Sequence, residues 1–187
     1  SKAIIRSMGG SVDAAQKYAI GAYAKATRVG LSAAEFSNKV AQNLSMANRV
    51  SFRGGIDGIT KMTALSEKLN FNLQSMEASA NVFRNDIQTA IESSAKLQAL
   101  GGGAAMYGSN PLAMMYESMY DMESYTERIT KMVKGMAEFN AATGIAEIKS
   151  QNQAFLREYS KILNISYDEL ASMATNQAKE AFSKNRL

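Results

Sequence analysis

The sequence contains no histidine, no cysteine and no tryptophan, and only one of its 187 residues is proline. Without histidine and cysteine the chain lacks an imidazole general base, a thiol nucleophile, disulfides and the usual side-chain ligands of zinc. Few runs of β-branched residues occur, which argues against an extensive sheet. No nucleophile has a visible base partner. We therefore expect that the protein is not an enzyme, has no cofactor or metal ion, and takes no small-molecule substrate.

Charge is also sparse. The 21 Lys and Arg residues and 17 Asp and Glu residues give a net charge of +4, and no block of five like charges occurs. Proteins bind the phosphates of nucleic acid through clustered Lys and Arg residues. Because this chain has no such cluster, we expect no sequence-specific nucleic-acid partner. Residues 97–116 carry no charge at all and have about the length of a bilayer span. Four glycines and Pro111 lie within this stretch and would interrupt a helix. An interrupted helix leaves backbone N–H and C=O groups without hydrogen-bond partners in the bilayer, which argues against a transmembrane helix.

What the chain does contain is one kind of helix joint, repeated at residues 29–36, 69–76 and 163–170. In each joint Gly or Asn, which tolerate positive φ, ends a helix, and an apolar residue follows it. Ser or Asn then caps the next helix. Ser32 with Glu35, and Ser166 with Glu169, have the spacing of a capping box. The joint residues are Gly30, Ser32, Asn70, Asn72, Asn164 and Ser166.

Apolar spacing predicts an all-α protein, with several amphipathic helices that are extended or loosely bundled. Helices are expected at 12–29 (opened by Ser11), 33–46 and 56–69, followed by one long helix at about 73–100. Strict three-four alternation along this long helix is typical of a coiled-coil-like seam, and it returns at 122–139. Two further helices follow. The expected packing seam consists of Leu73, Met76, Phe83, Ile87, Leu97, Met122, Tyr125, Ile129, Met132, Met136 and Phe139.

These patterns divide the chain into a helical segment at 1–100, a Gly-rich linker at 101–110 and a Met- and Tyr-rich helical segment at 111–187. The glycines at 101–103 could cradle a phosphate, but they follow a helix rather than a strand, which favours a helix stop with a hinge. Methionine adapts to irregular surfaces. The methionines between 106 and 136 therefore indicate either a core stripe or a plastic surface against copies of the chain or a surrounding protein.

Four carboxylates, at Glu117, Asp121, Glu123 and Glu127, are spaced along one predicted helix. Such a group could bind calcium or magnesium, but no ligand loop accompanies it. Arg128 and Lys131 are near enough in sequence to pair with these carboxylates. We therefore interpret the cluster as a solvated helix face and not as a metal site.

The order of these short motifs along the chain resembles that found in the tape-measure proteins of bacteriophage tails. The resembling stretches lie at 29–32, 69–72, 96–102, 139–144 and 165–170, within about residues 20–180. Similar successions of helix, "LG(L/V)S", helix and "LQ-LGG" recur in that family. The first residue is Ser and not Met, so we expect a fragment of a longer chain.

The resemblance implies a mostly helical protein in the lumen of the phage tail, assembled in the host cytoplasm, that sets tail length and plugs the tube until DNA is ejected. Its implied partners are copies of itself, the tail-tube protein and baseplate hub proteins, with membrane contact only on ejection. Two other functions stay open. One is a helical adaptor or assembly chaperone, and the other is a membrane-perturbing ejection protein of a virion or secretion machine.

Overall fold

The computed structural model describes residue 21 and residues 24–185, so the predicted helix start at Ser11 lies outside the described residues. A short helix at 24–29 leads into the rest. The helices are α3 (Ala33–Asn43), η1 (Leu44–Asn48), α4 (Gly55–Leu69), α5 (Leu73–Arg84), α6 (Ile87–Leu100), α7 (Gly102–Gly108), α8 (Pro111–Tyr120), α9 (Met122–Val133), η2 (Ser150–Asn152), α10 (Gln153–Leu163) and α11 (Tyr167–Asn185). The strands are β1 (Ala137–Asn140) and β2 (Ile145–Ile148). The predicted all-α class is confirmed, with one small hairpin added.

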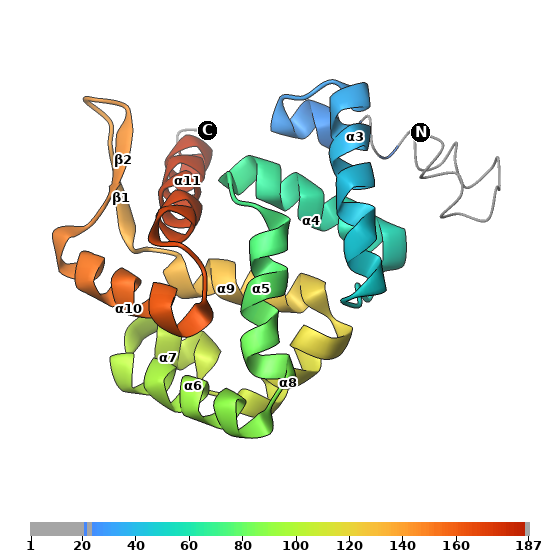
Figure 1. The fold of residues 1–187 in the computed structure, drawn as a ribbon. Coiled ribbons are helices and arrows are strands. Elements are labelled where there is room, and N and C mark those ends of the chain that lie inside the picture. Colours follow the sequence, from blue (N-terminus) through green and yellow to red (C-terminus); the bar gives the residue numbers. More distant parts are fainter. Residues whose placement is uncertain (1–20, 22–23, 186–187) are drawn as a thin grey trace.

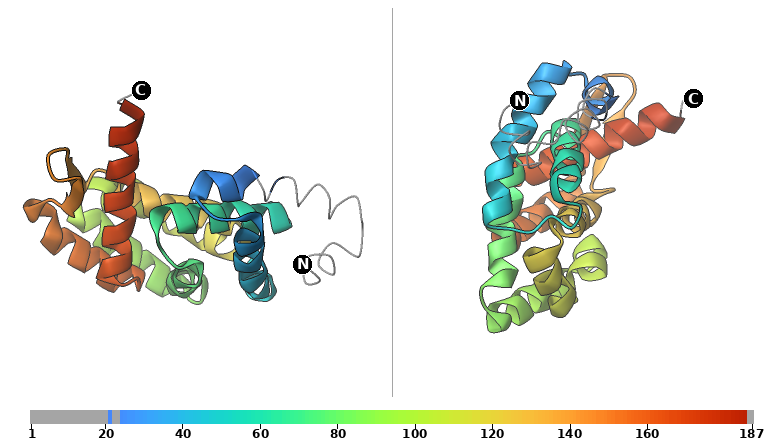
Figure 2. Two further views of the ribbon diagram at one scale, coloured as in Figure 1. Left: turned by 90° about the horizontal axis from the view of Figure 1, so that it is seen from above. Right: turned by 90° about the vertical axis from the view of Figure 1, so that its right-hand side faces the viewer.

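Helix α9 lies at the centre of the fold and contacts α4, α5, α7, α8 and α11 (Figure 1). Helices α6, α7 and α8 form the lower part of the molecule in this view, whereas α3 and α4 lie in the upper part. The C-terminal half of α11 projects from the body of the protein (Figure 2). Accordingly, only Leu170, Met173 and Ala174 of this helix are buried.

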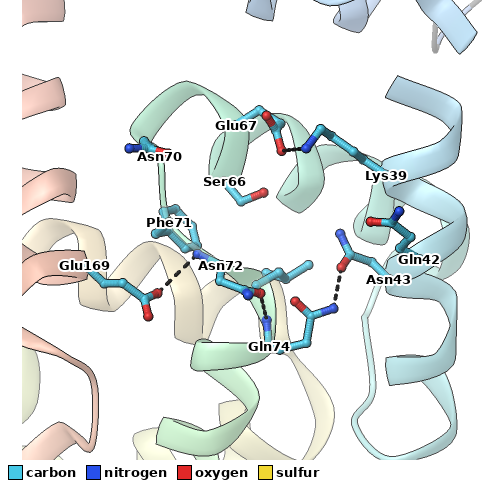
Figure 3. A pocket seen from close by; sticks show the side chains of 11 residues that line it. Lys39, Gln42, Asn43, Ser66, Glu67, Asn70, Phe71, Asn72, Gln74 and Glu169 are labelled. Carbon is cyan, nitrogen blue, oxygen red and sulfur yellow. Dashed lines mark hydrogen bonds and ion pairs between the residues drawn. The ribbon is translucent and has the colours of Figure 1, made fainter. Parts of the chain in front are cut away.

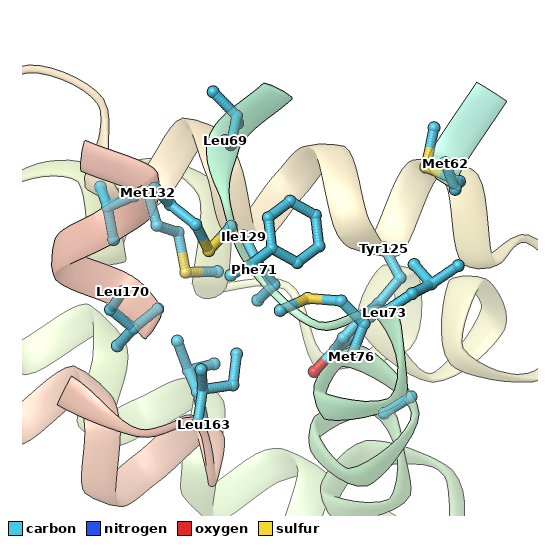
Figure 4. Packing of buried hydrophobic residues seen from close by; sticks show 14 of the residues in the cluster. Met62, Leu69, Phe71, Leu73, Met76, Tyr125, Ile129, Met132, Leu163 and Leu170 are labelled. Carbon is cyan, nitrogen blue, oxygen red and sulfur yellow. The ribbon is translucent and has the colours of Figure 1, made fainter. Parts of the chain in front are cut away.

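One hydrophobic core joins residues from α3 to α11. Leu73 and Met76 from α5 meet Ile129 and Met132 from α9, and Leu163 closes the core from α10 (Figure 4). Burying such side chains is worth about 1.5–3 kcal/mol each. The helices therefore pack around a shared centre in a compact arrangement, and the extended alternative is wrong for this part of the chain.

The predicted long helix at 73–100 is wrong, because the chain breaks between α5 and α6 at residues 85–86. The Asp86 carboxylate accepts hydrogen bonds from the backbone N–H groups of Gln88 and Thr89 and from the Thr89 hydroxyl, at 2.8–3.2 Å. A capping residue of this kind starts a new helix. The change of direction also removes Ile87 from the seam, since its side chain is 53% exposed.

The predicted Gly-rich linker at 101–110 is mostly helical, because residues 102–108 form α7. Two of its glycines lie where helices approach closely. A Cβ on Gly103 would stand 2.3 Å from the carbonyl oxygen of Met132, and a Cβ on Gly108 would stand 2.7 Å from Cδ1 of Leu97. The glycine content therefore serves close packing of α7 against α6 and α9 and not flexibility.

The predicted helix through residue 139 ends at Val133. Gly135 adopts a φ of +85°, and β1 and β2 then form an antiparallel hairpin in which Phe139 pairs with Ala146. Phe139 consequently leaves the seam and packs against Phe182 of α11, with ring centroids 4.5 Å apart. Helix α11 covers the hairpin.

Candidate functional site

All three joints have the predicted backbone geometry. The corner residues adopt positive φ, at +78° for Gly30, +56° for Asn70 and +55° for Asn164. The N–H of the next residue reaches back to a carbonyl of the last helical turn, as in a Schellman motif. These bonds run from Leu31 to Ala26 (2.9 Å), from Phe71 to Ser66 (3.0 Å) and from Ile165 to Ser160 (3.3 Å). The joints thus end their helices through local chemistry.

The capping predictions are confirmed at the first two joints. Ser32 and Glu35 form the full capping box, with both reciprocal bonds present. The Asn72 side chain accepts from the backbone N–H of Gln74 at 3.0 Å.

At the third joint only half of the predicted capping box exists. The Ser166 hydroxyl accepts from the N–H of Glu169 at 3.2 Å. The Glu169 carboxylate instead accepts from the N–H of Asn72 at 3.2 Å and from the Ser75 hydroxyl at 2.7 Å. Because Asn72 and Ser75 lie at the start of α5, Glu169 ties the third joint to the second.

A polar groove of about 450 Å³ lies at the second joint (Figure 3). Its amide groups bond one another, since Gln74 donates to Asn43 at 2.8 Å and Asn43 donates to Thr63 at 2.9 Å. Lys39 pairs with Glu67 at 3.0 Å across the rim. Most of the polar groups that line this groove already have partners within the protein, so the groove serves to connect α3, α4 and α5.

The four carboxylates of the acidic cluster are separated in the structure. Glu123 is buried and accepts from the backbone N–H groups of Arg53 and Gly54 at 2.8 and 2.7 Å, so it does not belong to a solvated face. Asp121 caps α9 through the N–H of Ser124. Glu127 pairs with Lys61 at 3.1 Å. Within residues 24–185 no group of three or more acidic side chains is placed to hold a metal ion.

The predicted pairing of Arg128 with this cluster is confirmed at Glu117. Two hydrogen bonds of 2.7 and 2.5 Å join the two side chains, and Arg128 also donates to the Tyr107 carbonyl at 2.8 Å. The hydrogen bond with Glu117 raises the pKa of Arg128. This pair links α7, α8 and α9, and it turns the only charged side chain of α8 towards the body of the protein.

Most of the predicted seam residues do lie in the core, although they form one globular centre in place of a coiled-coil seam. The buried members are Leu73, Met76, Phe83, Leu97, Met122, Tyr125, Ile129, Met132 and Met136. Tyr125 is fully buried, and its hydroxyl lies 2.7 Å from the Ser79 hydroxyl. Burial raises the pKa of Tyr125, so this hydroxyl stays neutral.

The sequence left open an adaptable surface between residues 106 and 136, and the structure places exposed side chains of this region on the outer face of α8, formed by Leu112, Tyr116 and Tyr120. These side chains are 67%, 61% and 57% exposed and recur at every fourth residue, so they line one face of the helix. The rings of Tyr116 and Tyr120 lie 5.2 Å apart. Met106, on the preceding helix, is also exposed. The four-residue spacing is visible in the sequence, but which face of α8 is buried depends on the tertiary structure.

The chemistry of this face is uniform. The buried side of α8 carries Met114 and Ser118, and Glu117 is engaged by Arg128, so the outer face presents only apolar and phenolic groups. Exposed apolar residues are ordinary when scattered singly, but an exposed stripe along one helix is typical of an interaction surface. No described helix is both long enough and apolar enough to cross a bilayer.

Comparisons of this chain with models of known protein families, with curated protein sequences and with solved structures found no match.

Proposed function

We propose that this chain is a structural, non-enzymatic segment of a bacteriophage tail tape-measure protein that associates with copies of itself through the outer face of α8. The observation that carries the proposal is the uncharged stripe of Leu112, Tyr116 and Tyr120. A two-fold interface brings the same surface of both copies together, so it requires a self-compatible face. An uncharged stripe meets that requirement because no like charges oppose each other.

The remainder of the proposal follows from the family resemblance of the helix joints. It adds the tail lumen as the location, the tail-tube protein and baseplate hub proteins as partners, and a role in setting tail length and plugging the tube. The intact joints at Gly30, Asn70 and Asn164 support this resemblance at the level of local structure.

Self-association is tested by sedimentation and light scattering of the full chain over a range of concentrations. We expect the wild-type chain to dimerise and Tyr116→Glu to weaken the dimer, because each copy would bury an unpaired carboxylate. Such a charge costs about 2 kcal/mol or more, which is roughly thirtyfold in the dissociation constant. Phe155→Glu is the matched control, since Phe155 is 43% exposed on α10, outside the stripe. A wild-type chain that stays monomeric, or equal weakening by both variants, would contradict the proposed interface.

The tail assignment needs a separate measurement. Mass spectrometry of purified particles should find the chain in intact tails and should find it depleted after DNA ejection. A long reading frame between the tail-tube and baseplate genes would agree with this. A short free-standing gene elsewhere would argue for the alternative function.

That alternative is a helical adaptor or assembly chaperone, and one observation favours it. The described helices share one hydrophobic core, which is the arrangement of a protein that folds on its own. An adaptor would be a monomer with a single cooperative thermal transition and would be absent from mature tails, so the two measurements above distinguish the functions.

A further inference from the structure

A second surface lies between helix 24–29, α4 and α9, and we call it the basic groove. Its volume is about 380 Å³, within the range of about 300–1,000 Å³ that is usual for ligand pockets. Of the described residues that line it, Glu127 is the one that is acidic. The cationic residues that line it are Lys25, Arg28, Lys61, Lys68 and Lys131.

The charge of the basic groove is only partly compensated by ion pairs with other described residues. Lys61 pairs with Glu127 at 3.1 Å, and Lys68 pairs with Glu180 at 2.6 Å. Lys25, Arg28 and Lys131 form no ion pair with any residue of the described chain. Three of the five cations that line the groove therefore have no ion-pair partner among the described residues.

Beneath these cations the groove is apolar. Val29, Ala64 and Leu65 are partly buried, and Met62 is fully buried below them. These aliphatic and thioether groups can accommodate side chains of varied shape. None of the described residues that line the groove is aromatic, so these residues supply no stacking surface of the kind on which proteins bind single-stranded nucleic acid.

We propose that the basic groove binds an acidic amphipathic segment of a partner protein. The partner's Leu or Ile side chains would occupy the apolar floor, and its carboxylates would pair with Lys25, Arg28 and Lys131. Charge complementarity and the partly buried apolar floor select this occupant. A membrane surface fits less well, because helices that bind membranes present an exposed apolar face and this floor is recessed.

This inference goes beyond the proposed function and does not depend on it. The basic groove involves helix 24–29, α4 and α9, whereas the self-association face consists of Leu112, Tyr116 and Tyr120 on α8. A monomeric chain could still bind the acidic segment, and a dimer could fail to bind it. The two proposals therefore fail separately.

The experiment measures binding of a fluorescent helical peptide that carries Leu at every third or fourth position and Glu elsewhere, with the full chain as receptor. We expect the combined variant Lys25→Glu, Arg28→Glu, Lys131→Glu to bind at least about tenfold more weakly, since each exposed ion pair contributes up to a few-fold. Raising the salt from about 0.1 M to about 1 M, which shortens the Debye length from roughly 10 Å to roughly 3 Å, should also weaken binding.

Matched controls separate this site from general attraction by a basic protein. Lys96→Glu reverses an exposed cation of α6 outside the groove and should leave affinity within about twofold, as expected for a remote charge. Ala64→Glu keeps a good helix former but places a carboxylate on the floor, and it should abolish binding while the helical circular dichroism is unchanged.

Three results would overturn the proposal. The first is equal loss of affinity for Lys96→Glu and for the combined groove variant. The second is equal binding of a peptide in which Lys replaces Glu or Ser replaces Leu. The third is tighter binding of single-stranded DNA or of phosphatidylglycerol vesicles than of the acidic peptide, with the same dependence on the groove cations.

Discussion

Replacing Gly103 with alanine should show that the glycine-rich stretch is a packing element. The added Cβ would stand 2.3 Å from the Met132 carbonyl oxygen and 3.1 Å from the carbonyl carbon. These are backbone atoms, so α7 must move away from α9 by roughly 0.7 Å or more. A gap of about 0.5–1 Å forfeits a quarter to a half of each dispersion contact. Ala104, the next residue of α7, is fully buried.

Overpacking of this kind lowers the free energy of unfolding by about 1–3 kcal/mol. We expect a loss at the upper end of this range, because the added Cβ clashes with backbone atoms of Met132. Alanine also favours the helix by up to about 1 kcal/mol, which leaves a net loss of about 2 kcal/mol. In urea denaturation followed by circular dichroism, the midpoint should fall by about 1 M for a slope near 2 kcal/mol/M.

A matched control for the Gly103 variant is Gly30→Ala. Gly30 has a φ of +78° with open space around its would-be Cβ, so this change costs only the conformational penalty of about 1–2 kcal/mol. A Gly103→Ala protein as stable as wild type, or more stable, would refute the reasoning. The 101–110 stretch would then act as a linker after all.

Two further predictions concern carboxylates. Burial alone would raise the pKa of Glu180, but hydrogen bonds from Lys68 and Lys184 outweigh it and hold this pKa below the ordinary value of 4.5. The pairing therefore stabilises the fold above that value, and the benefit is lost as the pH falls through the lowered pKa. In urea titrations, wild type should exceed Glu180→Gln in stability at neutral pH and converge with it in acid; a constant difference would contradict this. In the hairpin, Glu138 lies directly opposite Glu147, so Glu147→Lys should replace a repulsion and raise the free energy of unfolding by about 0.5–1 kcal/mol. A decrease would argue against this register.

The helix joints could be predicted from sequence because their chemistry is local. Positive φ at Asn70 or Asn164 and a capping hydroxyl at Ser32 depend on residues within one turn, and the structure confirms them. The signal for the break before α6 was also local, because Asp86 is a strong capping residue. The three-four alternation of apolar residues continues across this break, however, and led to the prediction of one helix that is too long. Periodicity continues through a tight turn when both flanking helices bury one face.

The rest of the fold depended on distant contacts. Gly103 is needed because the backbone of Met132, far along the chain, packs directly against it. The sequence around Gly103 does not show this contact, so it favoured a helix stop. The carboxylate of Glu169 bonds a different joint from the one in which its sequence places it. The basic groove likewise combines residues 25–28, 61–68 and 127–131, none of which forms a charge run by itself.

Compactness bears directly on how a tape-measure segment could act. A ruler needs residues that add length in proportion to their number, about 1.5 Å each in a straight helix. Here the longest described helix, α11, has 19 residues and spans only about 28 Å. Helices α4, α5, α7 and α8 pack directly against α9. Under the proposed function, this segment would contribute to anchoring or plugging, and measurement would require other, extended parts of the protein. Deleting one internal helix here should then impair assembly without shortening the tail in proportion.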